Sequence, residues 1–484
     1  MMRMGKYLIT AALVLEAMIL QAQFDAAAHS ADTAIHEIQK PPVLTSDVLF
    51  TVRSIYIHGN KKTRPSVILR ELPFKEGDVY ILSELVKKFE DGRRLLLSTA
   101  LFHEVVVALK SFEGYQVDIL IEVKERWYLF PIPYVKMVDR NINQWLFENN
   151  ARLNRVNYGV KILYNNATGR NDKLNIWLMN GYTKQLSVSY DRPYIDNKMK
   201  WGLNSGIAIG KNREVNYNTI YNKQVFFKDT NNYVRSFLRA FAELSYRPAI
   251  NSRHRFGMMV TEEKVTDTIV ALNPAYFKNG RDKISYPEFY YWFSYINVDY
   301  NPYPLKGFMG ELYFVKKGVN SHINLWQLHA KASGMWDVAN KTYFSTRVSG
   351  VIKLPFRQPY FNRRLLGYSD FFMQGYEYFV VDGVAGGYVK TILSREILNL
   401  NFHVKRKKEE LAYRVPLRVY LKAYANAGYM HNPDPGLNTL NNRMLYSGGI
   451  GIDIVTHYDF TFKLEWSFNQ LGQNDLYLHR KNYY

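Results

Sequence analysis

The sequence contains no cysteine among its 484 residues, and no long apolar run follows the N-terminal one that ends near Leu20. The absence of cysteine suits an oxidising compartment such as the bacterial periplasm, where stray thiols would pair wrongly. No later segment approaches the roughly 18 consecutive apolar residues that a transmembrane helix needs. Any later membrane span must therefore be a closed β-barrel, in which backbone polar groups are paired between strands.

Enzyme signatures are also missing. The chain has no phosphate-binding loop, no nucleophile elbow and no His-Glu-x-x-His pattern, and its 11 histidines show no ligand spacing. We therefore expect no enzyme activity, no catalytic residue, no metal and no cofactor.

The net charge of +20 would suit a nucleic-acid partner, but the basic residues are dispersed rather than gathered on a recognition helix. We therefore expect no nucleic-acid binding. One dense basic run, Lys405–Lys408, is placed in a barrel loop that meets anionic lipopolysaccharide or phospholipid. A solvated loop without a special role is the alternative.

Residues 1–28 are interpreted as a secretory signal peptide. Arg3 and Lys6 precede the apolar run Tyr7–Leu20, and small residues follow it. An N-terminal membrane anchor is the weaker alternative, because the run is too short to span a bilayer and Glu16 interrupts it. Residues 29–46 are then a linker.

The composition of the whole chain is typical of a transmembrane barrel. Mean hydropathy is only -0.28, although the chain holds 38 Tyr, 28 Phe and 8 Trp. In such a barrel only alternate residues face lipid, and aromatic residues gather at the two membrane interfaces. A soluble aromatic-rich β-sandwich would give similar totals, so the pattern along the chain must decide between the two.

Period-two alternation recurs through the C-terminal two thirds of the chain. Leu174, Ile176 and Leu178, for example, share one strand face, whereas charged residues such as Arg235 lie on polar faces that suit a wet lumen. About 330 residues at roughly 20 per strand and connection predict about 16 strands. The predicted fold class is mostly β, with a 16-stranded antiparallel transmembrane β-barrel over residues 127–484 behind one small α/β domain.

Residues 47–126 carry a different pattern, in which strand-like runs flank two segments of helical period. The predicted order is β-α-α-β-β, with a turn at Gly59 and Asn60, Ser83 as cap of the second helix, and Phe102 before the second strand. This order resembles a POTRA domain, a periplasmic domain that takes up client strands by edge pairing. A plain spacer domain without client contact is the alternative.

The segment Met373–Glu396 resembles the lumen loop and following strand of the Omp85 family, outer-membrane β-barrels that insert or export other proteins. The loop of that family begins with an Arg-Gly-aromatic triplet, and here the triplet is Gln374, Gly375 and Tyr376. The junction Val123–Pro133 adds a resemblance to short family members with one POTRA domain, most familiar from the Bacteroidetes.

This resemblance implies a set of lumen residues. In the family the loop arginine reaches carboxylates on the strands behind it. One of those positions is kept here as Glu396, and a second is Asn426. We therefore expect Gln374 to bond to Glu396 and Asn426 and to keep the loop docked in the lumen. An ordinary extracellular loop is the alternative position for Gln374.

The resemblance also implies a mechanism in which weakly paired first and last strands part, so that a client strand pairs with the exposed edge. The first strand is predicted at Asn154–Tyr164, around Val160, and the last at Asn474–His479, around Leu476.

We thus expect a bacterial outer-membrane protein that assists the insertion, assembly or translocation of envelope proteins. Its expected partners are client proteins, other assembly subunits, lipopolysaccharide and other outer-membrane lipids. A structural subunit without a gate and a two-partner-type secretion channel are the alternatives.

Overall fold

The computed structural model describes residues 48–137, 144–148, 150, 156–196, 198–229, 231–320, 322–405, 412–456 and 460–479. The signal peptide and linker predicted for residues 1–46 lie outside these ranges, and so does most of the basic run Lys405–Lys408. No helix in the described part of the chain is long and apolar enough to cross a membrane.

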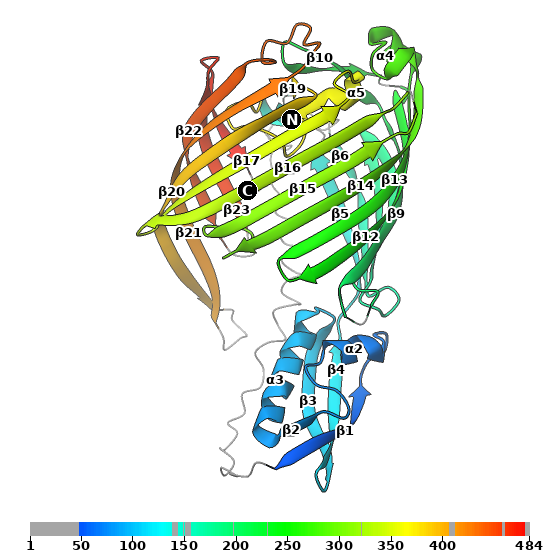
Figure 1. Ribbon diagram of the computed structural model, residues 1–484, viewed down its shortest axis with the longest axis vertical. Coiled ribbons are helices and arrows are strands. Elements are labelled where there is room, and N and C mark those ends of the chain that lie inside the picture. The colour runs from blue at the N-terminus through cyan, green and yellow to red at the C-terminus, as the bar shows by residue number, and fades with distance from the viewer. Residues whose placement is uncertain are drawn as a thin grey trace, which may run out of the picture. The chain divides into compact units, whose positions relative to one another are not determined.

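The N-terminal domain is a four-stranded sheet with two helices (Figure 1). Its elements are β1 (Leu49–His58), α2 (Pro65–Glu71), β2 (Val79–Ile81), α3 (Leu82–Ser98), β3 (Phe102–Glu113) and β4 (Gln116–Glu125). The strand order is β2-β1-β4-β3, with β1 parallel to β4. The predicted order of elements lacks only the short β2. Because β2 runs directly into α3, the helix begins at Leu82 and Ser83 does not cap it, contrary to our expectation.

An apolar core holds this domain together. One face of α3 buries Leu85, Phe89 and Leu96 at helical spacing against the sheet. Phe102, at the start of β3, is fully buried in the same core. The predicted turn after β1 contains Gly59 with φ +86°, where an added Cβ would collide with a backbone carbonyl of β4.

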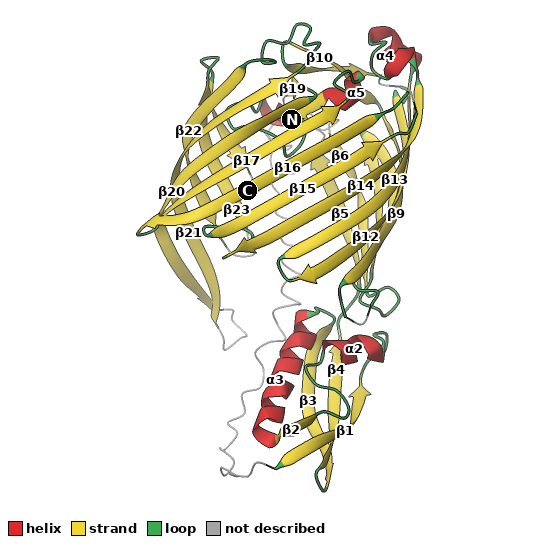
Figure 2. Cartoon of the chain, viewed as in Figure 1, coloured by secondary structure: helices red, strands yellow, loops and turns green. Residues whose placement is uncertain are grey.

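Most of the remaining described residues form one antiparallel sheet of sixteen strands (Figure 2), as predicted. In sheet order they are β5 (Leu129–Met137), β6 (Val156–Asn165), β7 (Lys173–Gly181), β8 (Thr183–Arg192), β9 (Trp201–Asn212), β12 (Arg235–Ala249), β13 (Ser252–Val265), β14 (Lys283–Val298), β15 (Gly307–Lys317), β16 (Leu325–Ala339), β17 (Thr342–Leu354), β20 (Ala385–Lys405), β21 (Ala412–His431), β22 (Met444–Val455), β23 (Thr461–Asn469) and β24 (Asn474–His479). The two ends of this order are β5 and β24.

Our prediction for the first strand is wrong by one strand. The predicted segment is β6, so Val160 lies beside the edge strand and not on it, whereas Leu476 does lie on the edge strand β24. The sequence around Pro131 and Pro133 did not indicate a strand, because proline lacks the N–H that a strand ladder uses. An edge strand tolerates proline on its free side.

Successive connections alternate between the two ends of the sheet because neighbouring strands are antiparallel. The longest ones share one end, where Figure 1 shows β10 (Glu214–Ile220), α4 (Asp267–Leu272), α5 (Tyr360–Arg363) and β19 (Val381–Asp382). Also in these connections are β11 (Lys223–Lys228), η3 (Lys278–Gly280) and β18 (Arg364–Leu366), while η1 (Gln144–Glu148) lies between β5 and β6. In bacterial barrels such long loops are extracellular and the short turns are periplasmic.

The N-terminal domain buries apolar side chains, whereas the sixteen-stranded sheet exposes them and buries charged ones. Large apolar side chains such as Leu186 and Leu238 are exposed on one face of their strands. Charged side chains are buried on the other face, where Arg235 Nε and Nη2 donate to the carboxylate of Glu263 at 2.7 Å each. This arrangement fits a wall with lipid outside and polar groups inside.

Candidate functional site in the barrel lumen

The connection between β17 and β20, residues 355–384, is called the lumen loop below. It carries its own apolar core, which packs on the inner faces of the neighbouring strands. From the loop this core includes Leu365, Leu366, Phe371, Met373, Tyr376 and Phe379, and from the strands it includes Val351, Tyr388, Met430 and Leu445. The loop is therefore a small folded unit on the strand wall.

The triplet that resembles the family motif lies where the loop meets β22 and β23. Gly375 has φ +87°, and an added Cβ would lie 2.9 Å from the Cβ of Ser447, so a larger residue does not fit without a shift. Asn469 Nδ2 donates to the Gly375 carbonyl at 2.6 Å, and the Tyr376 hydroxyl donates to the Tyr446 carbonyl at 3.1 Å. These contacts dock the triplet on both strands.

The structure gives Gln374 a different partner from the predicted ones. Its buried Nε2 donates to Glu465 Oε1 on β23 at 3.4 Å. Asn426 Nδ2 instead donates to Ser447 Oγ at 3.1 Å. The expected contacts of Gln374 with Glu396 and Asn426 are therefore wrong, although the loop is docked.

The register of β20 on β21 explains this difference. Lys390 is the residue paired with Asn426, and Glu396 pairs with Tyr420 six positions further along the strand. Six residues of strand span roughly 20 Å. Glu396 accepts a hydrogen bond from the Tyr420 hydroxyl at 3.3 Å, well outside the reach of Gln374.

The carboxylates beside Gln374 are neutralised from a strand. Lys422 Nζ on β21 lies 2.5 Å from Asp453 Oδ1 on β22 and 2.5 Å from Glu465 Oε1 on β23, and all three side chains are buried. Lys422 thus supplies one buried cation to both carboxylates, so the side chain of Gln374 beside them can be neutral.

Lys422 reaches across an entire strand because Gly451 lies between it and Glu465. Lys422 pairs with Gly451, which pairs with Glu465 on its other side. A Cβ on Gly451 would lie 3.1 Å from Lys422 Cε and 3.2 Å from Glu465 Cγ. In the sequence Lys422, Asp453 and Glu465 are separate charges on three successive strands, and only the strand register shows that they meet.

The lumen loop also contacts the edge strand β24. His479 Nε2 lies 3.3 Å from Glu377 Oε1 of the loop and 3.2 Å from Glu465 Oε2. The rings of Tyr378 and Tyr477 have centroids 5.6 Å apart. In the described part of the chain β24 has six residues, so these side-chain contacts add to a short backbone ladder with β23.

The other edge strand, β5, lacks two backbone N–H donors on its free side. Asn165 N donates to Tyr128 O at 2.8 Å, so the backbone groups of residue 128 point toward β6. Alternate strand residues point to opposite neighbours. Pro131 and Pro133 therefore point away from β6, where neither offers an N–H. Trp127 Nε1 donates to the Leu129 carbonyl on that same side.

The long loops at the extracellular end are joined by hydrogen bonds. Asn222, in the turn of the β10–β11 hairpin, accepts at its carbonyl from Val380 N of the lumen loop at 2.8 Å. Asn222 N donates to Asn438 Oδ1 at 2.8 Å, and Leu440 N donates to Asn222 Oδ1 at 3.0 Å. The hairpin thus ties the lumen loop to the connection between β21 and β22.

Comparisons with known proteins agree with both parts of this fold. The family model for POTRA, described as surface antigen variable number repeat, matches residues 50–126. Over 77 residues the chain is 35% identical to the outer membrane protein assembly factor BamA of Neorickettsia risticii (strain Illinois). That match covers 16% of this chain and 10% of the relative, so the chain spans only a small part of it.

A solved structure extends the likeness to the sheet. The crystal structure of BamA from Haemophilus ducreyi lacking POTRA domains 1-3 has a TM-score of 0.62 and 15% identity, covering 88% of this chain and 83% of that one. CdiB from Acinetobacter baumannii has a TM-score of 0.48 and 12% identity, covering 89% and 73%. The BamA match confirms the predicted fold class of a barrel behind a POTRA domain.

Proposed function

We propose that this chain, an Omp85-type outer-membrane protein with a periplasmic POTRA domain, assists the insertion, assembly or translocation of envelope proteins through a lateral seam between β5 and β24. The observation that carries the proposal is the weakness of both edge strands. Among the described residues, which end at 479, β24 has six residues, and β5 lacks N–H donors at Pro131 and Pro133 on its free side. A client strand would pair with these edges when they part.

The missing donors lower the cost of parting in lipid. Each unsatisfied backbone polar group in the hydrocarbon region costs several kcal/mol. A proline edge exposes fewer such groups when its partner leaves. Side chains of the lumen loop hold β24 through Glu377 and Tyr378, so movement of the loop would release the strand without breaking the rest of the wall.

The POTRA domain is proposed to present clients to the seam. The edge strands of its sheet are β2 and β3, and the longer β3 exposes Val106 and Phe112. An extended client segment can add to such an edge by main-chain hydrogen bonds, which tolerate many sequences. A spacer domain would not need an exposed edge of twelve residues.

Several further roles belong to the same proposal. Residues 1–28 would direct secretion, and the lipid-facing wall would meet lipopolysaccharide and other outer-membrane lipids. Other assembly subunits are proposed partners, and the role is non-enzymatic. The two alternatives predict different behaviour: a structural subunit would not open its seam, and a secretion channel would need its extracellular end uncovered. The loops joined through Asn222 favour a covered resting state.

A disulfide trap tests the seam in this cysteine-free chain. Val135 on β5 and Leu476 and Leu478 on β24 are exposed, so we would pair Val135→Cys with Leu476→Cys and with Leu478→Cys. A matched control lock joins β22 to β23 at the paired residues Ile452 and Leu464, away from the seam. Each locked protein is assayed for envelope-protein assembly before and after reduction.

The expected result is loss of assembly with a seam lock, recovery on reduction, and normal assembly with the control lock. Normal assembly with a locked seam would overturn the proposal and favour the structural subunit. Stable ion conductance of the locked protein, with secretion retained, would favour the channel.

A further inference from the structure

Two lysines face each other on the outer wall near its extracellular end. Asn212 Nδ2 of β9 donates to Thr183 Oγ1 of β8 at 2.9 Å, which sets these residues side by side. In an antiparallel pair the next residue of one strand opposes the preceding residue of the other. Lys184 therefore lies opposite Lys211.

The row continues across the next strands. Phe237 lies over Gly210, with a ring carbon 2.5 Å from the place of an added Cβ, so Lys211 lies beside Ser236. Ser236 pairs with Lys264. The row, called the lysine row below, consists of Lys184, Lys211, Ser236, Lys264 and Lys283 on five neighbouring strands.

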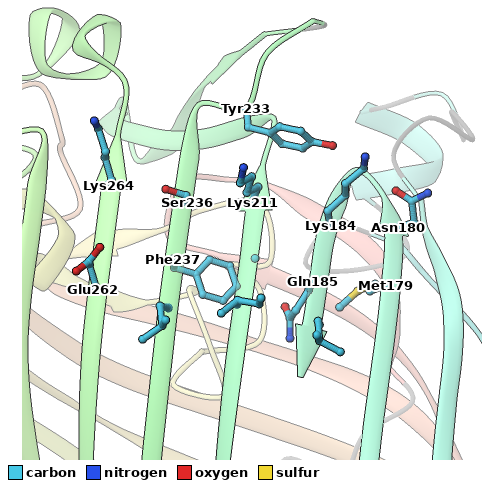
Figure 3. A pocket seen from close by; sticks show the side chains of 14 residues that line it. Met179, Asn180, Lys184, Gln185, Lys211, Tyr233, Ser236, Phe237, Glu262 and Lys264 are labelled. Atoms are coloured by element: carbon cyan, nitrogen blue, oxygen red, sulfur yellow. The ribbon is translucent and has the colours of Figure 1, made fainter. Parts of the chain in front are cut away.

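An apolar surface lies directly below the two facing lysines. Leu186, Ile209 and Leu238 are two positions further along their strands on the same face, and each is about two fifths exposed, at 39%, 44% and 39%. They line a groove of about 620 Å³ together with Lys184, Lys211, Ser236, Lys264 and the carboxylate of Glu262 (Figure 3). Two strand residues span roughly 7 Å, so cations and apolar side chains lie at successive membrane depths.

Two of the four lysines in the row have acidic partners, and both lie at the same end of the row. Lys264 Nζ lies 3.6 Å from Asp282, and Lys283 Nζ lies 2.8 Å from Glu262. In the described part of the chain neither Lys184 nor Lys211 has an acidic partner. Lys184 instead lies 5.7 Å from the centre of the Tyr233 ring, on whose face Arg213 also lies at 5.3 Å.

We propose that this groove binds a phosphorylated glycolipid of the outer leaflet. Its phosphoryl group would sit between Lys184 and Lys211, and an acyl chain would cover Leu186, Ile209 and Leu238. Two like charges on opposing strand positions repel each other, and an anion between them removes that repulsion. The proposal depends on the place of the barrel in the outer membrane and not on an opening seam, so it can fail or stand separately from the proposed function.

The test uses the full chain in phosphatidylethanolamine nanodiscs that contain bisphosphorylated lipid A. Native mass spectrometry measures how much lipid A each variant retains. The double variant Lys184→Gln/Lys211→Gln should retain lipid A about tenfold more weakly, because two phosphate contacts at a membrane interface are lost. The variant Lys184→Arg/Lys211→Arg should retain it fully.

The matched control is Lys198→Gln/Lys200→Gln, which removes two exposed lysines from the turn at the other end of β8 and β9. It should bind lipid A as the unchanged chain does, and the heat-induced gel shift of each variant verifies its folding. Equal binding by the Lys184→Gln/Lys211→Gln variant and the control would overturn the site. Equal binding of lipid A stripped of its phosphoryl groups, or full displacement by inorganic phosphate, would also overturn it.

Discussion

The hairpins β20–β21 and β23–β24 stand near each other in one sheet and are held in different ways. β20 and β21 have 21 and 20 residues, and their register runs from Ala385↔His431 to Lys405↔Ala412 with one shift. β24 has six residues. The long hairpin has a backbone ladder along its whole length, whereas the last strand has a short ladder and also contacts side chains of the lumen loop.

This difference shows where the wall can yield. The cost of separating two strands in lipid grows with the number of backbone groups that lose partners. At the long hairpin that cost is large, and at the edges a short strand and two prolines make it small. The buried Lys422 lies between these regions and ties β21 to both β22 and β23.

The largest expected effect follows from removing that tie. In Lys422→Met, Asp453 and Glu465 lose the buried cation that they share, and only the more distant Lys463, 3.8 Å from Asp453, remains. This loss should lower the free energy of unfolding by about 3 kcal/mol. Guanidinium unfolding in detergent, followed by tryptophan fluorescence, measures the loss. The control Lys331→Met removes the more exposed ion pair with Glu311 and should cost less than about 1 kcal/mol.

The double variant Gln374→Arg/Lys422→Met sharpens this test. The new arginine starts from a position whose side chain already reaches Glu465, so it should restore part of the lost stability. A loss from Lys422→Met no larger than that from Lys331→Met would show that the buried cluster does not brace the wall.

The second effect concerns the edge of β5. The variant Pro131→Val/Pro133→Val adds two N–H donors on the side that faces away from β6, and each new hydrogen bond to β24 should stabilise the closed seam by about 1 kcal/mol. We expect slower envelope-protein assembly and a higher unfolding midpoint. Pro416→Val on β21 is the control and should leave assembly unchanged. Unchanged assembly in the double variant would argue against a seam at this edge.

A smaller effect is expected where the lumen loop meets the last strand. His479→Phe keeps an aromatic ring but removes the polar contacts with Glu377 and Glu465. Hydrogen exchange in the β24 backbone should accelerate, corresponding to about 1 to 2 kcal/mol of lost protection. Protection in β20 and β21 should not change. Uniform acceleration across both hairpins would contradict the local role of this contact.

The smallest expected effect concerns stability in acid. It should appear in the POTRA domain and not at the seam. Arg53 donates to Asp118 through Nε at 2.9 Å and Nη2 at 2.5 Å, and Ser111 Oγ donates at 2.8 Å. Chiefly through Arg53, these bonds lower the pKa of Asp118 to about 2. An unfolded aspartate titrates near pH 3.9, so the stabilisation is complete above about pH 4 and is lost as pH falls through 2.

Pepsin cleavage of the full chain measures this loss. At each pH the cleavage rate of the Asp118→Asn variant is divided by the cleavage rate of the unchanged chain. The ratio should be highest near pH 4 and approach one near pH 2. Ser111→Ala should give an intermediate ratio. A ratio independent of pH would show that the Asp118 carboxylate does not stabilise the domain.

The sequence determined the architecture. The architecture follows from local patterns. These are the strict alternation in the C-terminal part, the length available for about 16 strands and the helical period of residues 47–126, and each pattern reflects which side chains an element buries. The triplet Gln374, Gly375 and Tyr376 also marked the lumen loop, because only glycine fits its close approach to β22.

Only the tertiary structure decided which residues meet. It gave Gln374 the partner Glu465 in place of Glu396, and it made β5 the first strand although its prolines did not indicate a strand. The physical reason is register. A shift of one or a few residues along a ladder leaves the alternation intact but exchanges every cross-strand neighbour, so residues such as Lys422 and Lys211 acquire their roles only when the strands are paired.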